Sequence, residues 1–302
     1  MLERILDVLA RGEIVIGDGA IGTTLQARGL TPGAMPEGWN LERPEEIRVM
    51  HQAYLDAGAR FVTTNTFGGN RYRLAQAGLT ERLAELNTAG VQLARETVEE
   101  RAWVAASVGP TGQLLEPLGD LSVAQAEEAY AEQVVLLAEA GADLIKIETM
   151  NDLEEACCAI RMAKQHTALP ISCTFAFDAR GRTLMGTRAA EAAQRAVEAG
   201  ADIVGANCGE GPTAVAVAIL AMSAVTSVPL LAQANAGIPQ ADAHQQAHWD
   251  ITPEQMGVHA HDFVSAGAQI VSGCCGTGPA HVAAIVAALR GVQLGPRTPA
   301  RR

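Results

Sequence analysis

Short apolar segments that end in polar or thiol residues recur along the chain. Four decapeptides share one pattern, in which Ala-Gly-Ala precedes an apolar run: AGARFVTTNT (57–66), AGADLIKIET (140–149), AGADIVGANC (199–208) and AGAQIVSGCC (266–275). The glycine suits the C-terminal end of a helix, and the apolar run suits a buried strand. Each copy therefore predicts a helix that ends and a strand that begins.

The spacing of the copies predicts alternating strands and helices. Neighbouring copies leave room for about two strand-helix units of roughly 30 residues or more each. Further strands are predicted at 14–20, 102–109, 170–177 and 229–237. Helical stretches separate the strands, for example at 122–140, 152–166, 188–199 and 253–266. Eight strands that alternate with helices predict an α/β fold, an eight-stranded parallel (β/α)8 TIM barrel.

An open doubly wound sheet is the alternative for such alternation. It would more naturally carry a glycine-rich phosphate turn after the first strand, and GDGAIGTT (17–24) lacks the dinucleotide-binding spacing. One barrel fits a chain of 302 residues, so we expect a single domain over 1–302 with a mobile tail at 292–302. The irregular stretches 28–44 and 236–252 follow strand ends and are expected at the mouth.

A barrel fold would bring chemically active residues together. Active sites of such barrels lie at the C-terminal ends of the strands. The repeat places four residues at equivalent strand ends, namely Thr66, Thr149, Cys208 and Cys275. The residues just before them are Asn65, Glu148, Asn207 and Cys274. We therefore expect polar and thiol side chains to converge on one rim.

Charge and cysteine usage narrow the class of protein. The net charge is -12 and no basic stripe is present, so we expect neither nucleic acid nor an anionic membrane as a partner. No apolar stretch approaches the ~18 residues that span a bilayer. The N-terminal MLERILDVLARGE is predicted to form a short amphipathic helix and has no signal-peptide core. Six cysteines without signs of secretion indicate a reducing, cytoplasmic location.

Three of the cysteines form a candidate metal site. Cys208, Cys274 and Cys275 end two apolar runs, and three thiolates can hold zinc while its fourth position stays free for substrate. Adjacent residues of a strand point to opposite faces, so Cys274 and Cys275 can share one metal only where the strand has ended. Flanking Gly273 and Gly276 give the backbone that freedom. The alternatives are small buried packing residues, or a cysteine nucleophile without metal.

The other cysteines, histidines and aromatic residues carry weaker signals. Three cysteines in a predicted helix and strand are interpreted as packing residues: Cys157, Cys158 and Cys173. Two histidine pairs have spacings compatible with metal binding: His244 with His248, and His259 with His261. Histidines in such positions are more commonly just solvated. Three aromatic residues either line a cation-binding mouth or simply pack: Trp39, Tyr72 and Trp249.

Two acidic residues and one amide complete the candidate site. Asp18 and Glu148 end two other strands, and at the mouth they would form a pair of anions suited to a substrate ammonium group. A turn aspartate and a salt-bridged glutamate are the alternative. Asn235 offers a neutral oxygen that could occupy the fourth position of zinc until substrate displaces it.

Several segments in the same order resemble the homocysteine S-methyltransferase family. They are GDGAIGTTLQARG, NTFGGNRYRL, SVGPTGQLLEPLGDLS, IETMNDLEEA, GANCGEGP, NAGIP and SGCCGTGPAHV. The resemblance covers nearly the whole chain. NTFGGNR and GPTGQLLEPLG are most similar to the homocysteine-binding module of cobalamin-dependent methionine synthase.

The resemblance implies specific roles for the candidate residues. Cys208, Cys274 and Cys275 would be the zinc ligands and the catalytic residues of a methyltransferase that makes methionine. Asp18 and Glu148 would hold the amino group of homocysteine. Backbone amides near Gly19 and Ala20 would bind its carboxylate.

The methyl donor is left open between three alternatives. The expected donor is methylcobalamin or another corrinoid-bound methyl group. A self-contained enzyme would instead use a small sulfonium donor, S-methylmethionine or S-adenosylmethionine. A homocysteine-activating subunit would be inactive without a corrinoid partner protein. One barrel with no folate- or corrinoid-binding module fits a fragment, such a subunit or an enzyme that uses a small methyl donor.

Overall fold

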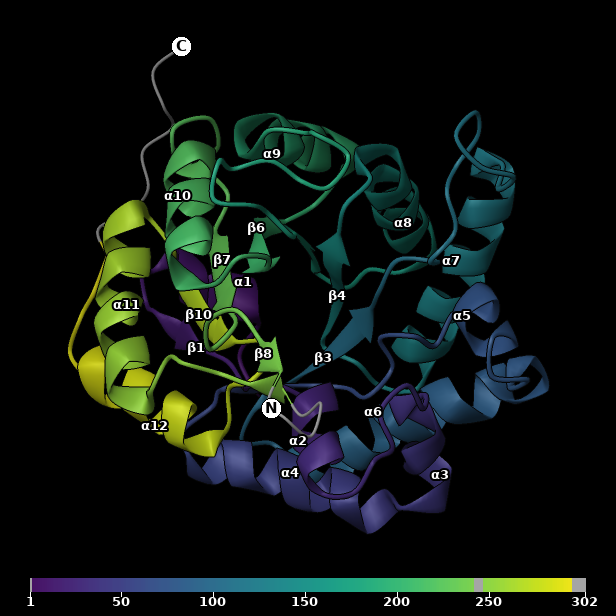
Figure 1. The fold of residues 1–302 in the computed structure, drawn as a ribbon, viewed down its shortest axis with the longest axis horizontal. Coiled ribbons are helices and arrows are strands. Elements are labelled where there is room, and N and C mark those ends of the chain that lie inside the picture. Colours follow the sequence, from purple (N-terminus) through teal and green to yellow (C-terminus); the bar gives the residue numbers. More distant parts are fainter. Residues whose placement is uncertain (1, 242–246, 295–302) are drawn as a thin grey trace.

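The computed structural model describes residues 2–241 and 247–294, and a parallel β-sheet forms its centre (Figure 1). Within these residues the sheet has eight strands in the order β1-β10-β7-β6-β5-β4-β3-β2. The strands are β1 (Val15–Ile16), β2 (Phe61–Thr63), β3 (Trp103–Val108), β4 (Leu144–Met150), β5 (Ile171–Phe175), β6 (Ile203–Cys208), β7 (Leu230–Ala234) and β10 (Ile270–Gly273). Every neighbouring pair is parallel.

The sheet curves into a nearly closed barrel. Its two outer strands, β1 and β2, come together where the Arg60 N–H donates to the Ile16 carbonyl at 2.7 Å. A doubly wound sheet would leave these two strands at opposite edges. The predicted TIM barrel is therefore confirmed, and each predicted strand segment overlaps a strand of the sheet.

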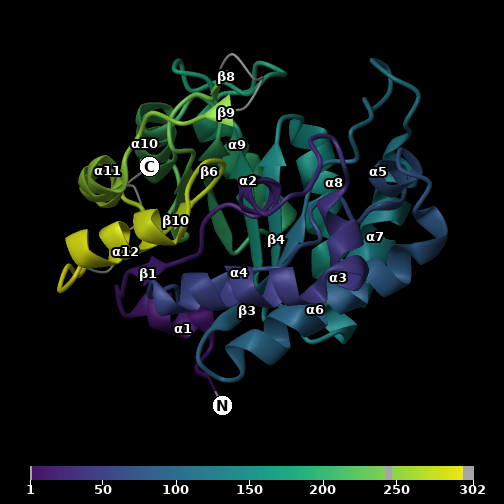
Figure 2. The ribbon, with the colours of Figure 1, turned by 60° about the horizontal axis from the view of Figure 1, so that its bottom comes forward.

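Helices surround the barrel and cover its strands (Figures 1 and 2). They include α4 (Pro44–Asp56), α6 (Leu83–Val98), α7 (Val123–Glu139), α8 (Leu153–His166), α9 (Ala189–Ala199), α10 (Pro212–Ser223), α11 (Pro253–Ala266) and α12 (Pro279–Ala288). The predicted helices thus correspond to α7, α8, α9 and α11. Among the described residues, no helix is long and apolar enough to cross a membrane.

Short helices and strands lie in the connections between the main elements of the barrel. They are α1 (Ile5–Ala10), α2 (Gly22–Ala27), η1 (Pro36–Gly38), α3 (Trp39–Glu42), α5 (Arg71–Ala75), η2 (Thr80–Arg82), β8 (Gln240–Ala241) and β9 (Ala247–His248). Strands β8 and β9 form a small antiparallel pair. The first residues of the predicted mobile tail are packed instead: Val292 and Leu294 contact the core, and the Leu294 N–H donates to the Gly12 carbonyl at 3.1 Å. Residues 295–302 lie outside the described residues.

The repeated glycine has the role that the sequence predicts. Gly58, Gly141, Gly200 and Gly267 have φ angles of 100°, 100°, 115° and 111°. This left-handed conformation ends a helix and is strained for residues with a Cβ. The shared motif therefore turns the chain from each of four helices into the next strand.

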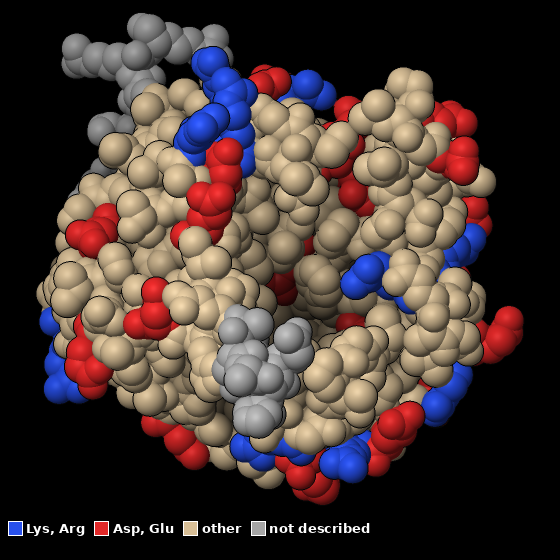
Figure 3. All heavy atoms as spheres, viewed as in Figure 1, with Lys and Arg blue, Asp and Glu red and all other residues tan. Residues whose placement is uncertain are grey.

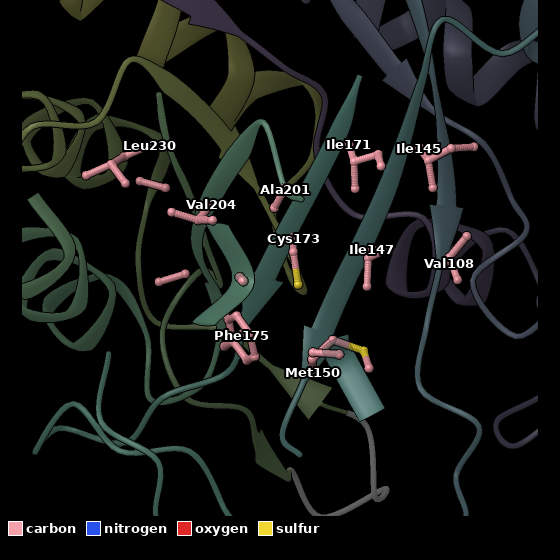
Figure 4. Packing of buried hydrophobic residues seen from close by; sticks show 14 of the residues in the cluster. Val108, Ile145, Ile147, Met150, Ile171, Cys173, Phe175, Ala201, Val204 and Leu230 are labelled. Carbon is pink, nitrogen blue, oxygen red and sulfur yellow. The ribbon is translucent and has the colours of Figure 1, made fainter. Parts of the chain in front are cut away.

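Alternate side chains along the strands face two different environments. Ile145 and Ile147 belong to the large apolar cluster that also contains residues of the surrounding helices. Cys173 lies among these apolar side chains (Figure 4), and Cys157 and Cys158 are buried on α8. The packing role predicted for these three cysteines is confirmed.

The interior of the barrel changes from apolar to polar along its axis. At the N-terminal end, α1 packs on inward-facing residues such as Phe61, Trp103 and Leu144. Two residues further along the same strands lie Thr63 and Lys146, and Ser107 and Glu148 come later still. These polar residues line a cavity at the C-terminal end. The fold thus presents polar side chains where barrel active sites form.

Candidate functional site

Three cysteine side chains meet at the C-terminal end of the barrel. Cys208 is the last residue of β6, and Cys274 and Cys275 directly follow β10. Their sulfur atoms all lie within 4.8 Å of one another, and the trio is the one group of this kind found in the described residues. The predicted convergence is confirmed.

The backbone at these cysteines departs from strand geometry. Cys208 has a φ of 53° and Gly209 a φ of 62°, so β6 ends abruptly there. Strand β10 ends at Gly273, and Gly276 has a φ of 79°. A Cβ atom on Gly276 would lie 2.2 Å from the indole ring of Trp249. The flanking glycines therefore allow both adjacent thiols to face one point, as the sequence predicts.

The three cysteine thiols differ in pKa. Hydrogen bonds from the Cys208 and Cys274 thiols lower the pKa of Cys275 to about 4. Hydrogen bonding to Cys274 and Cys275, together with burial, raises the pKa of Cys208 well above its ordinary value. The cluster alone therefore favours one thiolate and two thiols. Ionising all three would require a cation between them, and zinc is suited to such sulfur ligands.

Asn235 contributes an oxygen atom without a partner. Its side-chain amide donates to the Gly209 carbonyl at 3.3 Å, but its buried Oδ1 accepts no hydrogen bond. The next residue is tied to the cysteine loop, because the Ala236 N–H donates to the Cys275 carbonyl at 2.9 Å. An unpartnered buried oxygen is compatible with a metal ligand, and the ligand role of Asn235 stays a prediction.

A cavity of about 330 Å³ opens beside the cysteines (Figure 3). Its volume lies in the usual range for small-ligand sites. The three cysteines form part of its wall, together with inward-facing barrel residues Thr63, Ser107, Lys146, Glu148 and Gln233. Met35 and the η1 residues Pro36 and Glu37 also line the cavity, so the expectation that 28–44 reaches the mouth is confirmed.

Glu148 lies in this cavity with both carboxylate oxygens engaged. Oε1 accepts from the Ser107 hydroxyl at 2.5 Å. Oε2 accepts from the Lys146 ammonium at 3.0 Å and from the Gln233 amide at 2.9 Å. The carboxylate is therefore held in a fixed orientation by residues of two other strands, β3 and β7, and by Lys146 of its own strand.

Asp18 is buried beside the cavity and does not line it. Its oxygens accept from the Thr63 N–H at 2.5 Å and the Thr63 hydroxyl at 2.8 Å. Burial raises the pKa of Asp18 to about 6, although the charge of Lys146 and the bonds from Thr63 act in the opposite direction. At neutral pH the carboxylate is thus mainly ionised, and Thr63 stands between it and the cavity.

The backbone segment predicted to bind a carboxylate lines the cavity. Gly19, Ala20, Ile21 and Gly22 all form part of its wall. The Ala20 N–H, however, donates to the Thr277 carbonyl at 3.1 Å. The Ala20 amide is therefore engaged within the protein, and the carboxylate-binding role predicted for this segment stays a prediction.

Comparison with known families gives this site a context. The sequence model of the family described as homocysteine S-methyltransferase matches residues 15–289. The chain belongs to this family. The methionine synthase of Mycobacterium tuberculosis is 31% identical over 307 residues, covering 96% of this chain and 26% of that protein. The methionine synthase of Mycobacterium leprae is 29% identical, covering 94% of this chain and 25% of that protein.

Solved structures also resemble the chain. The metallated form of the homocysteine methyltransferase MmuM from Escherichia coli superposes with a TM-score of 0.79 at 25% identity, covering 93% of this chain and 98% of that one. Its apo form gives a TM-score of 0.73. The chain spans about a quarter of the length of the curated relatives that it matches.

Several site residues of this family member were not singled out from its sequence. Lys146, Gln233 and Ser107 all contact Glu148. The sequence does indicate Lys146. In IKIET it alternates with Ile145 and Ile147, as Glu148 does, so Lys146 and Glu148 share one face of the strand. The partners on other strands have no such signal in the sequence.

The weaker candidates lie elsewhere. Trp39 packs in an apolar cluster, Tyr72 packs against the main core, and neither lines the cavity. Trp249 covers Gly276 and is likewise absent from the cavity wall. His259 and His261 lie on α11 outside the cysteine cluster, and His244 lies outside the described residues.

Proposed function

We propose that this chain catalyses zinc-dependent transfer of a methyl group to the sulfur of homocysteine, giving methionine. The observation that carries the proposal is the cysteine trio, with sulfur atoms within 4.8 Å of one another, at the wall of a polar cavity in a homocysteine S-methyltransferase fold. A metal-free cysteine nucleophile would need only one of these thiols. The location inferred from the free cysteines is cytoplasmic.

The trio fits a zinc ion on its own chemistry. Cys208, Cys274 and Cys275 would supply three sulfur ligands, and Asn235 has an unpartnered oxygen for a displaceable fourth contact. When bound there, zinc would keep the homocysteine thiol, whose ordinary pKa is about 8.5, deprotonated at neutral pH. Deprotonation makes the sulfur nucleophilic toward a methyl group.

The cavity offers separate groups for the two ends of the amino acid. Glu148, with the charge of Asp18 behind it, would attract the ammonium group. Amides of the segment around Gly19 would bind the carboxylate. Fixing both ends orients the sulfur toward the donor, and such orientation contributes about 7 kcal/mol or more to catalysis in favourable cases.

The rim of the barrel supports a corrinoid-bound methyl donor. Exposed apolar side chains lie on loops that follow β3, β5 and β7: Leu114, Leu118, Leu184 and Ile238. Leu184 is 86% exposed. These loops offer apolar side chains to another protein or domain, and the chain resembles methionine synthases of which it spans about a quarter. We therefore favour a partner that presents methylcobalamin or a related corrinoid over a small sulfonium donor.

Substitution of the cysteines tests the proposal. Cys208→Ala, Cys274→Ser and Cys275→Ser should each abolish both stoichiometric zinc, measured by elemental analysis, and methionine formation. Cys173→Ala is the matched control, since this buried thiol lies outside the trio and its loss should leave zinc content unchanged. Full activity in a zinc-free variant would contradict the proposal.

The donor is tested with separate assays. Purified protein would be supplied in turn with methylcobalamin, S-adenosylmethionine, S-methylmethionine and betaine. Turnover with methylcobalamin alone supports the corrinoid donor, and turnover with a sulfonium compound alone excludes it. Homocysteine binding without turnover would identify a homocysteine-activating subunit that needs a corrinoid partner protein.

A further inference from the structure

The barrel interior contains a lysine that the proposed reaction does not require. Lys146 is 1% exposed, and its ammonium group donates to Glu148 Oε2 at 3.0 Å and to the Thr63 hydroxyl at 3.1 Å. The chain has only one other lysine, Lys164, which lies on the surface of α8. A buried lysine is rare unless it is paired, and this one is paired inside the cavity.

The charge of Lys146 changes what the cavity offers to a substrate. Asp18 and Glu148 provide two negative charges, and Lys146 offsets one of them. The other charged residues of the cavity wall, Glu37 and Arg73, belong to the loop around η1 and to α5. One net negative charge therefore remains among the three groups at the base of the cavity.

Glu148 has hydrogen-bond partners besides Lys146 that hold its orientation. The Ser107 hydroxyl holds Oε1, and the Gln233 amide holds Oε2 at 2.9 Å. The contribution that only Lys146 makes is its positive charge. The Lys146 ammonium group lies beside the Glu148 carboxylate that an incoming ammonium group would also approach.

We propose that Lys146 competes with the α-ammonium group of the ligand for Glu148 and so limits the affinity of the site for amino acids. The inference rests on the proposed function, in which Glu148 receives that group. Two cations beside one carboxylate repel each other, so Lys146 weakens the contribution of the amine to binding. Because homocysteine and methionine both carry the amine, Lys146 lowers the affinity for substrate and product alike and favours product release.

Binding to the zinc-loaded protein tests this inference. Dissociation constants of wild type, K146M and the surface control K164M would be measured by calorimetry for homocysteine and for 4-mercaptobutanoate, which lacks the amine. Methionine and 4-(methylthio)butanoate form a second pair without a thiol. In K146M we expect homocysteine and methionine to bind about tenfold more tightly, a change of about 1.4 kcal/mol, with both amine-free ligands unchanged.

The outcomes separate the inference from the proposed function. Unchanged or weaker binding of both amines in K146M would overturn the competitor role and make Lys146 an organising group. Equal tightening of the amine-free ligands would overturn it as well. If no ligand binds to any variant, the proposed function fails instead.

A second variant protects the test against misfolding. K146Q keeps a hydrogen-bond donor at this position but removes the charge, and it should show the same amine-dependent tightening. If neither variant folds, the wild-type protein decides. Its affinity for homocysteine should exceed that for the amine-free 4-mercaptobutanoate by less than about tenfold. A ratio of about a hundredfold would refute competition at Glu148.

Discussion

Asn207 forms two hydrogen bonds with Thr149 across the mouth of the barrel. Asn207 Oδ1 accepts from the Thr149 N–H at 2.9 Å, and its amide nitrogen donates to the Thr149 hydroxyl at 2.7 Å. Thr149 has a φ of 62°, an uncommon conformation for a β-branched residue. The two bonds therefore stabilise the strained end of β4 and tie it to the residue that precedes Cys208.

Removal of this contact should weaken metal binding. Asn207→Ala keeps all three cysteines but removes both bonds to Thr149 and the contact of the Asn207 amide with Cys274 Sγ at 3.9 Å. Outer-shell substitutions of this kind cost about 10–100-fold in metal affinity, and we expect a loss in that range. Competition with a chromophoric zinc chelator would measure it.

A neighbouring bond provides the control. The Thr174 hydroxyl donates to Asn207 Oδ1 at 2.8 Å, so Thr174→Val removes one bond and retains both contacts with Thr149. Its zinc affinity should change only a few-fold by comparison. If the Asn207 variant bound zinc as tightly as wild type, the end of β4 would have no part in placing Cys208.

The repeat made the fold and the cysteine trio predictable from sequence. Each copy of Ala-Gly-Ala marks a helix end, since Gly200 and Gly267 must adopt a positive φ there. The strands that follow then place Cys208 and Cys275 at equivalent ends. Closure of the barrel brings these ends together, and closure follows from the number and direction of the strands.

The contacts inside the barrel were not predictable in the same way. Alternation indicates that Lys146 and Glu148 share a face, but not that Gln233 and Ser107 reach the same carboxylate. Those partners come from strands far apart in the chain. Likewise, only the structure shows that Thr63 separates Asp18 from the cavity, because that depends on side-chain reach across a curved sheet.

Glu148→Gln should weaken homocysteine binding and leave the metal in place. The substitution removes the charge that we propose attracts the ammonium group. A charge-assisted hydrogen bond is about twice as strong as a neutral one, so we expect the dissociation constant to rise about tenfold or more. Calorimetric titration of the zinc-loaded variant would measure it.

Two controls accompany this variant. Zinc content should equal that of wild type, since Glu148 is not in the sulfur cluster. Glu154→Gln changes a half-exposed glutamate on α8 that pairs with Arg161 and Arg195, and it should leave homocysteine affinity unchanged. Equal affinity in the Glu148 variant and wild type would exclude the ammonium-binding role.

His51 should make the protein less stable in mild acid. Its ring on α4 is fully buried, neither nitrogen has a hydrogen-bond partner, and burial lowers its pKa to about 4 from an ordinary 6.5. Between these two values the unfolded chain binds a proton that the folded protein does not. The contribution of His51 to stability is therefore present above pH 6.5 and is lost as pH falls toward 4, by up to about 3 kcal/mol.

Urea unfolding at pH 7 and pH 5 would measure this dependence. His51→Leu cannot take up a proton, so its free energy of unfolding should fall less between the two pH values than that of wild type. His259→Leu is the control, because His259 lies on α11 with a partly exposed side chain beside Asp262. If the free energy of unfolding fell equally in wild type and the His51 variant, other groups would cause the acid sensitivity. A smaller loss in the His51 variant alone would identify this unpartnered ring as one source of it.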